Sequence, residues 1–254
     1  MKYCVSGRQS KMILAQADEI KFQYKDRERI LDYIEGYSNK TFIIDIPKEE
    51  EIDDWDFLNM LNEKTNIVLG VRDLKIINGH DFKFYWAYPV TTWYELQGIA
   101  ALSPSYLFLE APLSFELEKV KSQFDISIRL NANLTYDAYI PRENGIYGTW
   151  VRPEDIEVYE KWVDVIEFLS DDLSKEATLF HVYKDQKTWP GNLNLLLTNL
   201  NYNIDNRAIP IEIGKIRANC GQRCMSGGAC NFCGTAFKFA KDVRKLYYQR
   251  KKLN

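Results

Sequence analysis

The chain has 254 residues, 46% of them hydrophobic and 14% aromatic, so it can bury a sizeable core, which argues against intrinsic disorder. Its formal net charge of −3 argues against wholesale coating of nucleic acid but leaves room for a local basic patch. No segment approaches the roughly 18 to 20 apolar residues that span a bilayer, and the first residues lack the apolar run of a signal peptide. We therefore expect no membrane contact and a cytoplasmic location, where thiols are kept reduced.

Short apolar runs alternate with amphipathic stretches along the first two thirds of the chain. The runs are rich in Val, Ile, Phe and Tyr and are bounded by Pro, Gly, Asn or Asp, which is typical of strands. We predict eight strands, over residues 3–6, 41–46, 67–71, 83–88, 106–110, 126–130, 148–152 and 163–168. Helices are predicted between them over residues 17–37, 55–63, 93–102 and 115–122, and residues 135–147 are expected to form a long loop.

Strands that alternate with helices imply parallel βαβ units with right-handed crossovers. Eight such strands favour an α/β fold of the (β/α)8 TIM-barrel type, with an open or incomplete barrel as the alternative. Beyond residue 168 the pattern changes to a helix over 175–187, a break at Trp189-Pro190-Gly191 and a short apolar helix over 193–200. We expect a barrel-like domain over residues 1–200, and a metal-binding segment with a basic helical tail over 201–254.

Four of the five cysteines fall within fourteen residues, at Cys220, Cys224, Cys230 and Cys233. Three residues separate the first pair, two separate the last pair, and five lie between the pairs. Two chelating pairs joined by a Gly-rich turn can wrap four thiolates around one centre, because glycine permits the positive φ angles of a tight knuckle. The alternative, four unpaired or disulfide-linked cysteines, explains this spacing less well. The sequence therefore predicts a metal centre with these four ligands.

Four soft sulfur ligands select zinc or an iron–sulfur cluster over magnesium or calcium. Tetrahedral zinc accommodates the short spacing easily, and we favour structural zinc, with a 4Fe–4S cluster as the alternative. A zinc ion with four protein ligands would stabilise the fold and leave no position for a substrate. The fifth cysteine, Cys4, is expected to be a strand residue in the core.

Basic residues surround the cysteine segment. Lys215, Arg217 and Arg223 flank it, and residues 238–252 form a helix-like tail with seven basic residues and one acid. Their simplest role is to offset the −2 charge of a tetrathiolate zinc centre and to form a solvated helix face. The other interpretation is a contact with a nucleic-acid or protein partner through the basic tail.

In a barrel, catalytic residues sit at the carboxyl ends of the strands. Asp45 and Glu110 are the best candidates, since each ends an apolar strand and precedes a proline by two residues. Two carboxylates across a barrel mouth could serve as acid and base, as in glycoside hydrolysis. The alternative is that each begins a surface loop.

Three polar residues are candidates for substrate binding. Asn131 and Asn133 follow one strand and, two residues apart, can project to the same side. Arg152 ends another predicted strand, although Pro153-Glu154-Asp155 after it is typical of a helix start. Neither histidine, His80 or His181, has a partner suited to a catalytic triad or a metal pair.

The predicted barrel, combined with Gly221-Gln222-Arg223-Cys224-Met225-Ser226, resembles the collagenase-like peptidase family. That family includes iron–sulfur proteins of oxygen-independent hydroxylation and RNA modification. The resemblance implies a cluster held by Cys220, Cys224, Cys230 and Cys233, with RNA or a small aromatic compound as substrate. The segment from Asn219 to Cys224 also resembles small bacteriophage-encoded proteins.

Two classes of function are consistent with these features. The first is a zinc-stabilised barrel-like protein with a binding or assembly role. The alternative is a metal-dependent enzyme, either an iron–sulfur enzyme that modifies RNA or a small molecule, or a carboxylate-dependent hydrolase acting at the barrel mouth. Whether the chain is an enzyme is left open by the sequence.

Overall fold

A computed structural model describes residues 1–46, 48, 52–109, 115–133, 150–168, 170–197, 205–209 and 218. These divide into two compact units. The first unit comprises Met1–Leu109, Phe124–Arg129 and Val163–Glu167, and the second holds the described residues of the remainder. The predicted domain boundary at residue 200, the loop over 135–147, the four-cysteine segment and the basic tail lie outside the described residues.

Eight parallel strands close into a barrel in chain order, which confirms the predicted α/β class and the closed barrel. Each strand pairs with its sequence neighbours, and the first strand also pairs with the last, so that Cys4 lies beside Glu19 on one side and Glu167 on the other. The strands are β1 Lys2–Ser6, β2 Glu19–Gln23, β3 Thr41–Ile46, β4 Asn66–Val71, β5 Phe84–Trp86, β6 Tyr106–Phe108, β7 Ser127–Asn131 and β8 Val165–Glu167.

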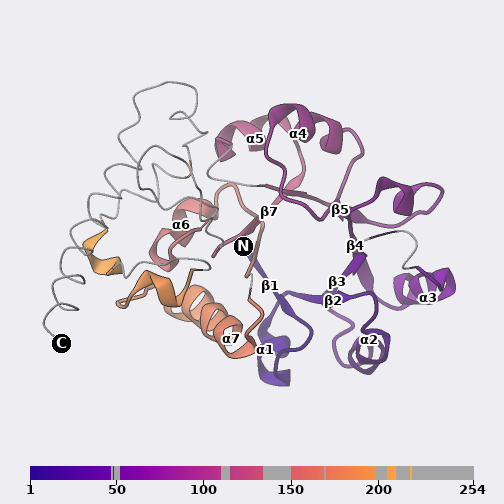
Figure 1. The fold of residues 1–254 in the computed structure, drawn as a ribbon, viewed down its shortest axis with the longest axis horizontal. Helices are drawn as coiled ribbons and strands as arrows, with labels where there is room; N and C mark the ends of the chain where they lie inside the picture. Colours follow the sequence, from indigo (N-terminus) through magenta and orange to yellow (C-terminus); the bar gives the residue numbers. More distant parts are fainter. Residues whose placement is uncertain are drawn as a thin grey trace, which may run out of the picture. The chain divides into compact units, whose positions relative to one another are not determined.

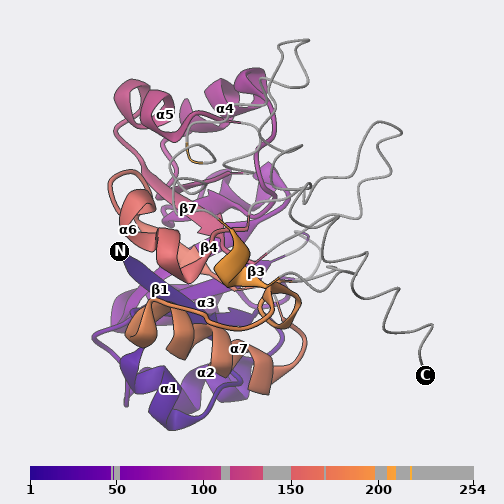
Figure 2. The same cartoon turned by 90° about the vertical axis from the view of Figure 1, so that its left-hand side faces the viewer.

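Seven α-helices occur among the described residues, and the first four belong to the first unit. They are α1 Lys11–Gln16, α2 Arg27–Ile34, α3 Trp55–Lys64, α4 Trp93–Ala100, α5 Leu117–Gln123, α6 Ile156–Tyr159 and α7 Leu173–His181, with short 3-10 or π segments at η2 Leu74–Ile77, η3 Pro153–Asp155, η4 Val182–Gln186, η5 Leu193–Leu195 and η6 Asn206–Ala208. In Figure 1, α1, α2 and α3 lie outside the strands β1 to β4. Figure 2 shows α1 and α2 on one side of β1.

Side-chain caps determine where several of these helices begin. The Asp54 carboxylate accepts a hydrogen bond from the Phe57 amide at the start of α3, and the Thr92 hydroxyl accepts one from Glu95 at the start of α4. Asp172 caps α7 in the same way. Each cap satisfies a backbone N–H that has no partner within its helix.

The eight predicted strands and the eight observed strands are not the same set. The helix predicted over residues 17–37 is wrong, because that stretch contains β2 before α2 begins at Arg27. Of the predicted strand 148–152, the described residues 150–152 are not a strand, and Arg152 instead precedes the 3-10 turn Pro153–Asp155. Proline favours the first turn of a helix, so the alternative interpretation of Pro153-Glu154-Asp155 is the correct one.

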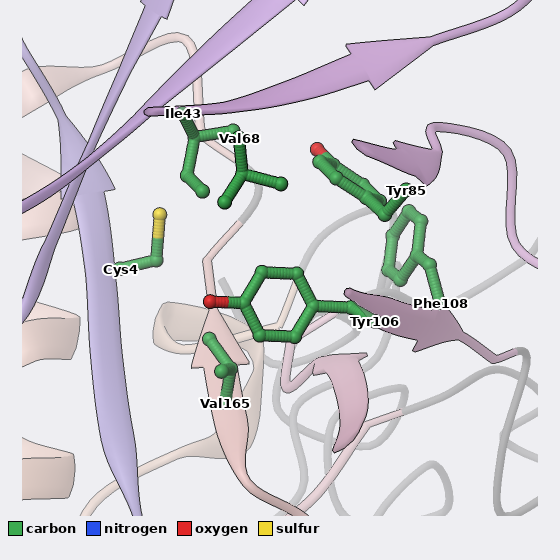
Figure 3. Packing of buried hydrophobic residues seen from close by; sticks show 7 residues of the cluster. All are labelled: Cys4, Ile43, Val68, Tyr85, Tyr106, Phe108 and Val165. Carbon is green, nitrogen blue, oxygen red and sulfur yellow. The ribbon is translucent and has the colours of Figure 1, made fainter. Parts of the chain in front are cut away.

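The two faces of the strands differ in polarity. Side chains that point outward toward the helices are apolar and buried; on β2, Phe22 stacks on Phe42 of β3 with ring centroids 5.7 Å apart. Inside the barrel, apolar and aromatic side chains form one cluster, drawn in Figure 3: Cys4, Ile43, Val68, Tyr85, Tyr106, Phe108 and Val165. Polar and charged side chains share this interior, and they define the candidate site.

Candidate active site

Charged residues occupy consecutive layers of the barrel interior. Because alternate residues of a strand point to the same face, Glu19, Lys21 and Gln23 of β2 all point inward. The registers place Gln23 beside Asp45 of β3, and Asp45 beside Gly70 of β4. The interior of a barrel is usually filled by branched apolar side chains, so charges here need specific partners.

Arg129 of β7 is the centre of the deeper layer, and its side chain has no exposed surface. Its Nη1 donates to Glu19 Oε2 at 2.7 Å, and its Nε and Nη2 donate to Glu167 Oε2 at 2.9 and 2.6 Å. The Tyr106 hydroxyl donates to the other Glu19 oxygen at 2.6 Å. A buried guanidinium with two carboxylate partners is thus well satisfied.

Lys21 lies nearer the carboxyl ends of the strands, and 25% of its side chain is exposed. Its Nζ lies 3.1 Å from Asp45 Oδ2 and 3.5 Å from Glu167 Oε2. An ammonium has three N–H groups, so among the described residues one N–H is left for a ligand or water. Burial lowers the pKa of Lys21, but the carboxylates of Glu167 and Asp45 raise it more, and the net pKa lies well above the ordinary value. Lys21 is therefore a cation at neutral pH.

Asp45 is the predicted catalytic residue on which the other side chains of this layer converge. Its Oδ1 accepts from the Tyr85 hydroxyl at 3.2 Å, and its Oδ2 accepts from Gln23 Nε2 at 3.4 Å and pairs with Lys21. Each carboxylate oxygen has two lone-pair directions, so Oδ1 can accept a second hydrogen bond. Below, the mouth cluster denotes Lys21, Gln23, Asp45, Tyr85 and Glu167.

The protonation states of the neighbouring groups follow from their surroundings. Burial would raise the pKa of Glu167, but Lys21 and Arg129 lower it more, so the net pKa lies below the ordinary value and Glu167 is a carboxylate. Burial raises the pKa of Tyr85, and Asp45 raises it further, so Tyr85 is a neutral donor. Burial raises the pKa of Cys4 to about 12, so this buried thiol is not a nucleophile at neutral pH.

Aromatic side chains lie where β4 and β5 end. Trp86 is the last residue of β5, and its ring centroid is 5.8 Å from that of Tyr88, whose side chain is exposed. The Arg72 guanidinium, which follows β4, lies 5.0 Å from the Tyr88 ring centroid. An exposed ring beside a cation, such as that of Tyr88, is suited to contact a planar or sugar-like group of a ligand.

The three predicted substrate-binding residues are all buried, in the second unit. Asn131 ends β7 and accepts a long hydrogen bond of 3.4 Å from the Asn133 amide, while Asn133 Nδ2 donates to the Leu196 carbonyl at 3.4 Å. Arg152 pairs with Asp155 at 2.7 Å and donates to the Ile209 carbonyl at 3.1 Å. These contacts give each residue a role in packing, and substrate binding by them stays a prediction.

The remaining predicted site residues, Glu110 and the four metal ligands Cys220, Cys224, Cys230 and Cys233, lie outside the described residues. Within the described ranges, no group of three or more His, Cys, Asp or Glu side chains is arranged to hold a metal ion. In the same ranges, no helix is both long and apolar enough to cross a membrane.

Sequence reasoning missed Lys21 because it assigned β2 to a helix. The signal was present in Glu19-Ile20-Lys21-Phe22-Gln23, where charged or polar residues alternate strictly with apolar ones, as they do in a strand. Arg129 and Glu167 were on predicted strands, but no local feature of the sequence indicates that they pair.

Comparison with known proteins gives no family for this chain: no protein-family model, curated protein or solved structure matches it.

Proposed function

We propose that the chain is a carboxylate-dependent hydrolase whose active site is the mouth cluster. One observation carries the proposal: a partly exposed ammonium, Lys21, contacts two carboxylates at the strand ends of a barrel, where enzymes of this fold place their catalytic groups. Buried ion pairs contribute little net stability compared with apolar residues of similar volume. Charged side chains at this position are therefore better explained by a catalytic role than by a contribution to the stability of the fold.

The cluster supplies the groups that hydrolysis of an ester or amide requires. Asp45 Oδ1 can accept a proton from a water molecule as that water attacks the carbonyl carbon, and the same proton then passes to the leaving group. The remaining N–H of Lys21 can donate to the carbonyl oxygen as it gains negative charge. Gln23 and Tyr85 hold the Asp45 carboxylate in place, and Glu167, which is itself held by Arg129, keeps Lys21 oriented and charged.

The test compares hydrolysis by the wild-type chain and by Asp45→Asn on a panel of p-nitrophenyl esters, p-nitroanilides and p-nitrophenyl glycosides. Loss of a general base costs about 100-fold or more in rate, so we expect Asp45→Asn to lose at least that. Asp32→Asn is the matched control, because Asp32 is exposed on α2. A wild-type chain that hydrolyses no member of the panel, or an Asp45→Asn variant as fast as the control, would refute the proposal.

A second proposal rests on the four-cysteine segment. Zinc held by Cys220, Cys224, Cys230 and Cys233 would stabilise the fold of a protein that binds a partner through its basic tail or takes part in an assembly. A 4Fe–4S cluster held by the same cysteines would instead supply redox chemistry. The spacing of the cysteines in the sequence supports a metal in either case. The two proposals are compatible, because the mouth cluster contains none of these cysteines.

A further inference from the structure

A cavity of about 340 Å³ lies within the second unit, lined by side chains of three separate segments. The 3-10 turn η3 contributes Glu154, the turn after η4 contributes Trp189 and Pro190, and η6 with the residue after it contributes Asn206 and Ile209. This volume falls in the range of sites that bind small molecules. The proposed hydrolase does not use any of these residues.

Two hydrogen-bond acceptors in the cavity lining have no donor. Glu154 and Asn206 lie side by side, since Asn206 Nδ2 donates to Glu154 Oε1 at 2.7 Å. The other oxygen of each side chain, Glu154 Oε2 and Asn206 Oδ1, is buried and accepts no hydrogen bond within the described chain. Asn206 as a whole is only 3% exposed. An unsatisfied buried acceptor costs about 1–3 kcal/mol, so two neighbours in one cavity indicate a ligand with two donors.

The position of these acceptors is fixed by the chain. Glu154 Oε1 also accepts from the Trp189 amide at 2.6 Å, and Asn206 Nδ2 also donates to the Trp189 carbonyl at 2.8 Å. The carboxylate and the carboxamide therefore hold each other and the Trp189 backbone in one arrangement. Both side chains are therefore ordered before a ligand binds, which lowers the entropic cost of binding. Because their free oxygens are buried, a ligand donor reaches them when the two side chains shift toward the cavity.

The charges that line the cavity leave one carboxylate unbalanced. Arg152 is paired with Asp155, and Arg207 is paired with Asp205. No cationic side chain of the described residues pairs with Glu154. The group that best complements the pair of acceptors is therefore a cation with at least two N–H donors.

The Trp189 ring, which lines the cavity, favours a planar cation over an ammonium. The Trp189 indole is oriented by donating its Nε1–H to the Asn192 carbonyl at 3.0 Å, and Gly191 leaves it room, since a Cβ there would lie 2.9 Å from the ring. Planar guanidinium and amidinium groups stack on aromatic faces and present parallel N–H donors, whereas an ammonium is a strongly hydrated point charge.

We propose that this cavity binds a small molecule bearing a guanidinium or amidinium group, which donates to Glu154 Oε2 and Asn206 Oδ1 and lies against Trp189.

The experiment is a calorimetric titration of the full chain with benzamidine and with its neutral analogue benzamide, which retains one NH2 donor but has no charge. We expect benzamidine to bind and benzamide to bind at least about tenfold more weakly. Glu154→Gln should weaken benzamidine binding by at least about tenfold, because it removes the charge and turns an acceptor into a donor. Glu157→Gln, at an exposed position on α6, is the matched control and should bind as the wild-type chain does.

The proposal would be overturned by no binding of benzamidine to the wild-type chain at millimolar concentration, by equal affinity for benzamide and benzamidine, or by undiminished binding to a folded Glu154→Gln variant. If Glu154→Gln fails to fold, the comparison of the two compounds on the wild-type chain still decides the matter. Preferential binding of guanosine, which presents two neutral N–H donors, would likewise exclude a cationic ligand.

Discussion

Gly70 determines how closely Asp45 and Tyr85 can approach inside the barrel. A Cβ built at Gly70 would lie 2.3 Å from Asp45 Oδ1 and 3.0 Å from both the Tyr85 hydroxyl oxygen and a carbon of its ring. The first distance is far below van der Waals contact, and Asp45 is held by three partners. A larger residue on β4 is therefore incompatible with the mouth cluster as it stands.

We predict that Gly70→Ala lowers the free energy of unfolding by about 1–3 kcal/mol, the usual cost of an added methyl group in a packed interior. Gly98→Ala is the control, since Gly98 lies in α4 with open space around its Cβ position, and alanine there should stabilise the chain by up to about 1 kcal/mol. Urea unfolding of both variants measures the difference. Equal stability of the two would contradict the close approach of Asp45 and Gly70.

Strand β2 carries the charges that connect the two polar layers of the barrel. Glu19 faces Arg129 in the deeper layer, and Lys21, two residues on, reaches both Asp45 and Glu167. The outward side chains Ile20 and Phe22 are buried. This strict alternation lets one short strand contribute both to the apolar core and to an ion-pair network.

The Glu167 carboxylate makes stability depend on pH in the acid range. Its pKa is lower in the folded chain than in the unfolded chain, so its contribution is complete above the unfolded value of about 4.3 and is lost as pH falls through the folded value. Lys21 has a raised pKa, so its contribution is complete below about pH 10.4 and is lost only at higher pH. Lowering the pH therefore reduces the stability of the fold through protonation of Glu167, and the contribution of Lys21 is unchanged.

We predict that Glu167→Gln costs about 3–5 kcal/mol at pH 7, since it leaves Arg129 and Lys21 without a buried partner charge. The difference in Tm between this variant and the wild-type chain should shrink as pH is lowered below about 4.3, because the wild-type side chain then also loses its charge. Differential scanning calorimetry from pH 7 to pH 3 measures the Tm of both chains. A constant difference across this range would show that Glu167 is not ionised in the folded chain.

At the scale of the whole molecule, the closed barrel is one source of stability, and the proposed metal centre of the four-cysteine segment would be a second, separate one. The barrel closes through pairing of β1 with β8, which lie far apart in the sequence. Metal binding contributes to folding free energy wherever the site does not exist in the unfolded chain. The cysteine segment therefore has a testable consequence for the stability of the complete chain.

We predict about one zinc ion per chain and no visible colour in protein purified without oxygen. The double variant Cys220→Ser with Cys233→Ser should lose the metal and unfold at a lower temperature, while Cys4→Ser, which alters a buried thiol of β1, should retain the metal. Elemental analysis and the absorption spectrum measure both. Iron, sulfide and a broad absorbance near 400 nm would show that the chain holds an iron–sulfur cluster and not zinc. Unchanged metal content in the double variant would exclude Cys220 and Cys233 as ligands.

The sequence by itself determined the α/β class and the place of Asp45 at a strand end, and it favoured a closed barrel over an open one, because strand composition and the repeat of strand and helix are local signals. Closure itself was decided by the tertiary structure. The sequence predicted eight strands, but it missed β2 and included residues 148–152. The alternating pattern of β2 spans only five residues and is followed closely by the amphipathic stretch of α2, so the two were assigned to one helix. Only the tertiary structure decided that Lys21, Asp45, Arg129 and Glu167 form one network, and that Glu154 and Asn206 share a cavity. The physical reason is that these contacts join residues far apart in the chain, and barrel closure and packing, not local sequence, bring them together.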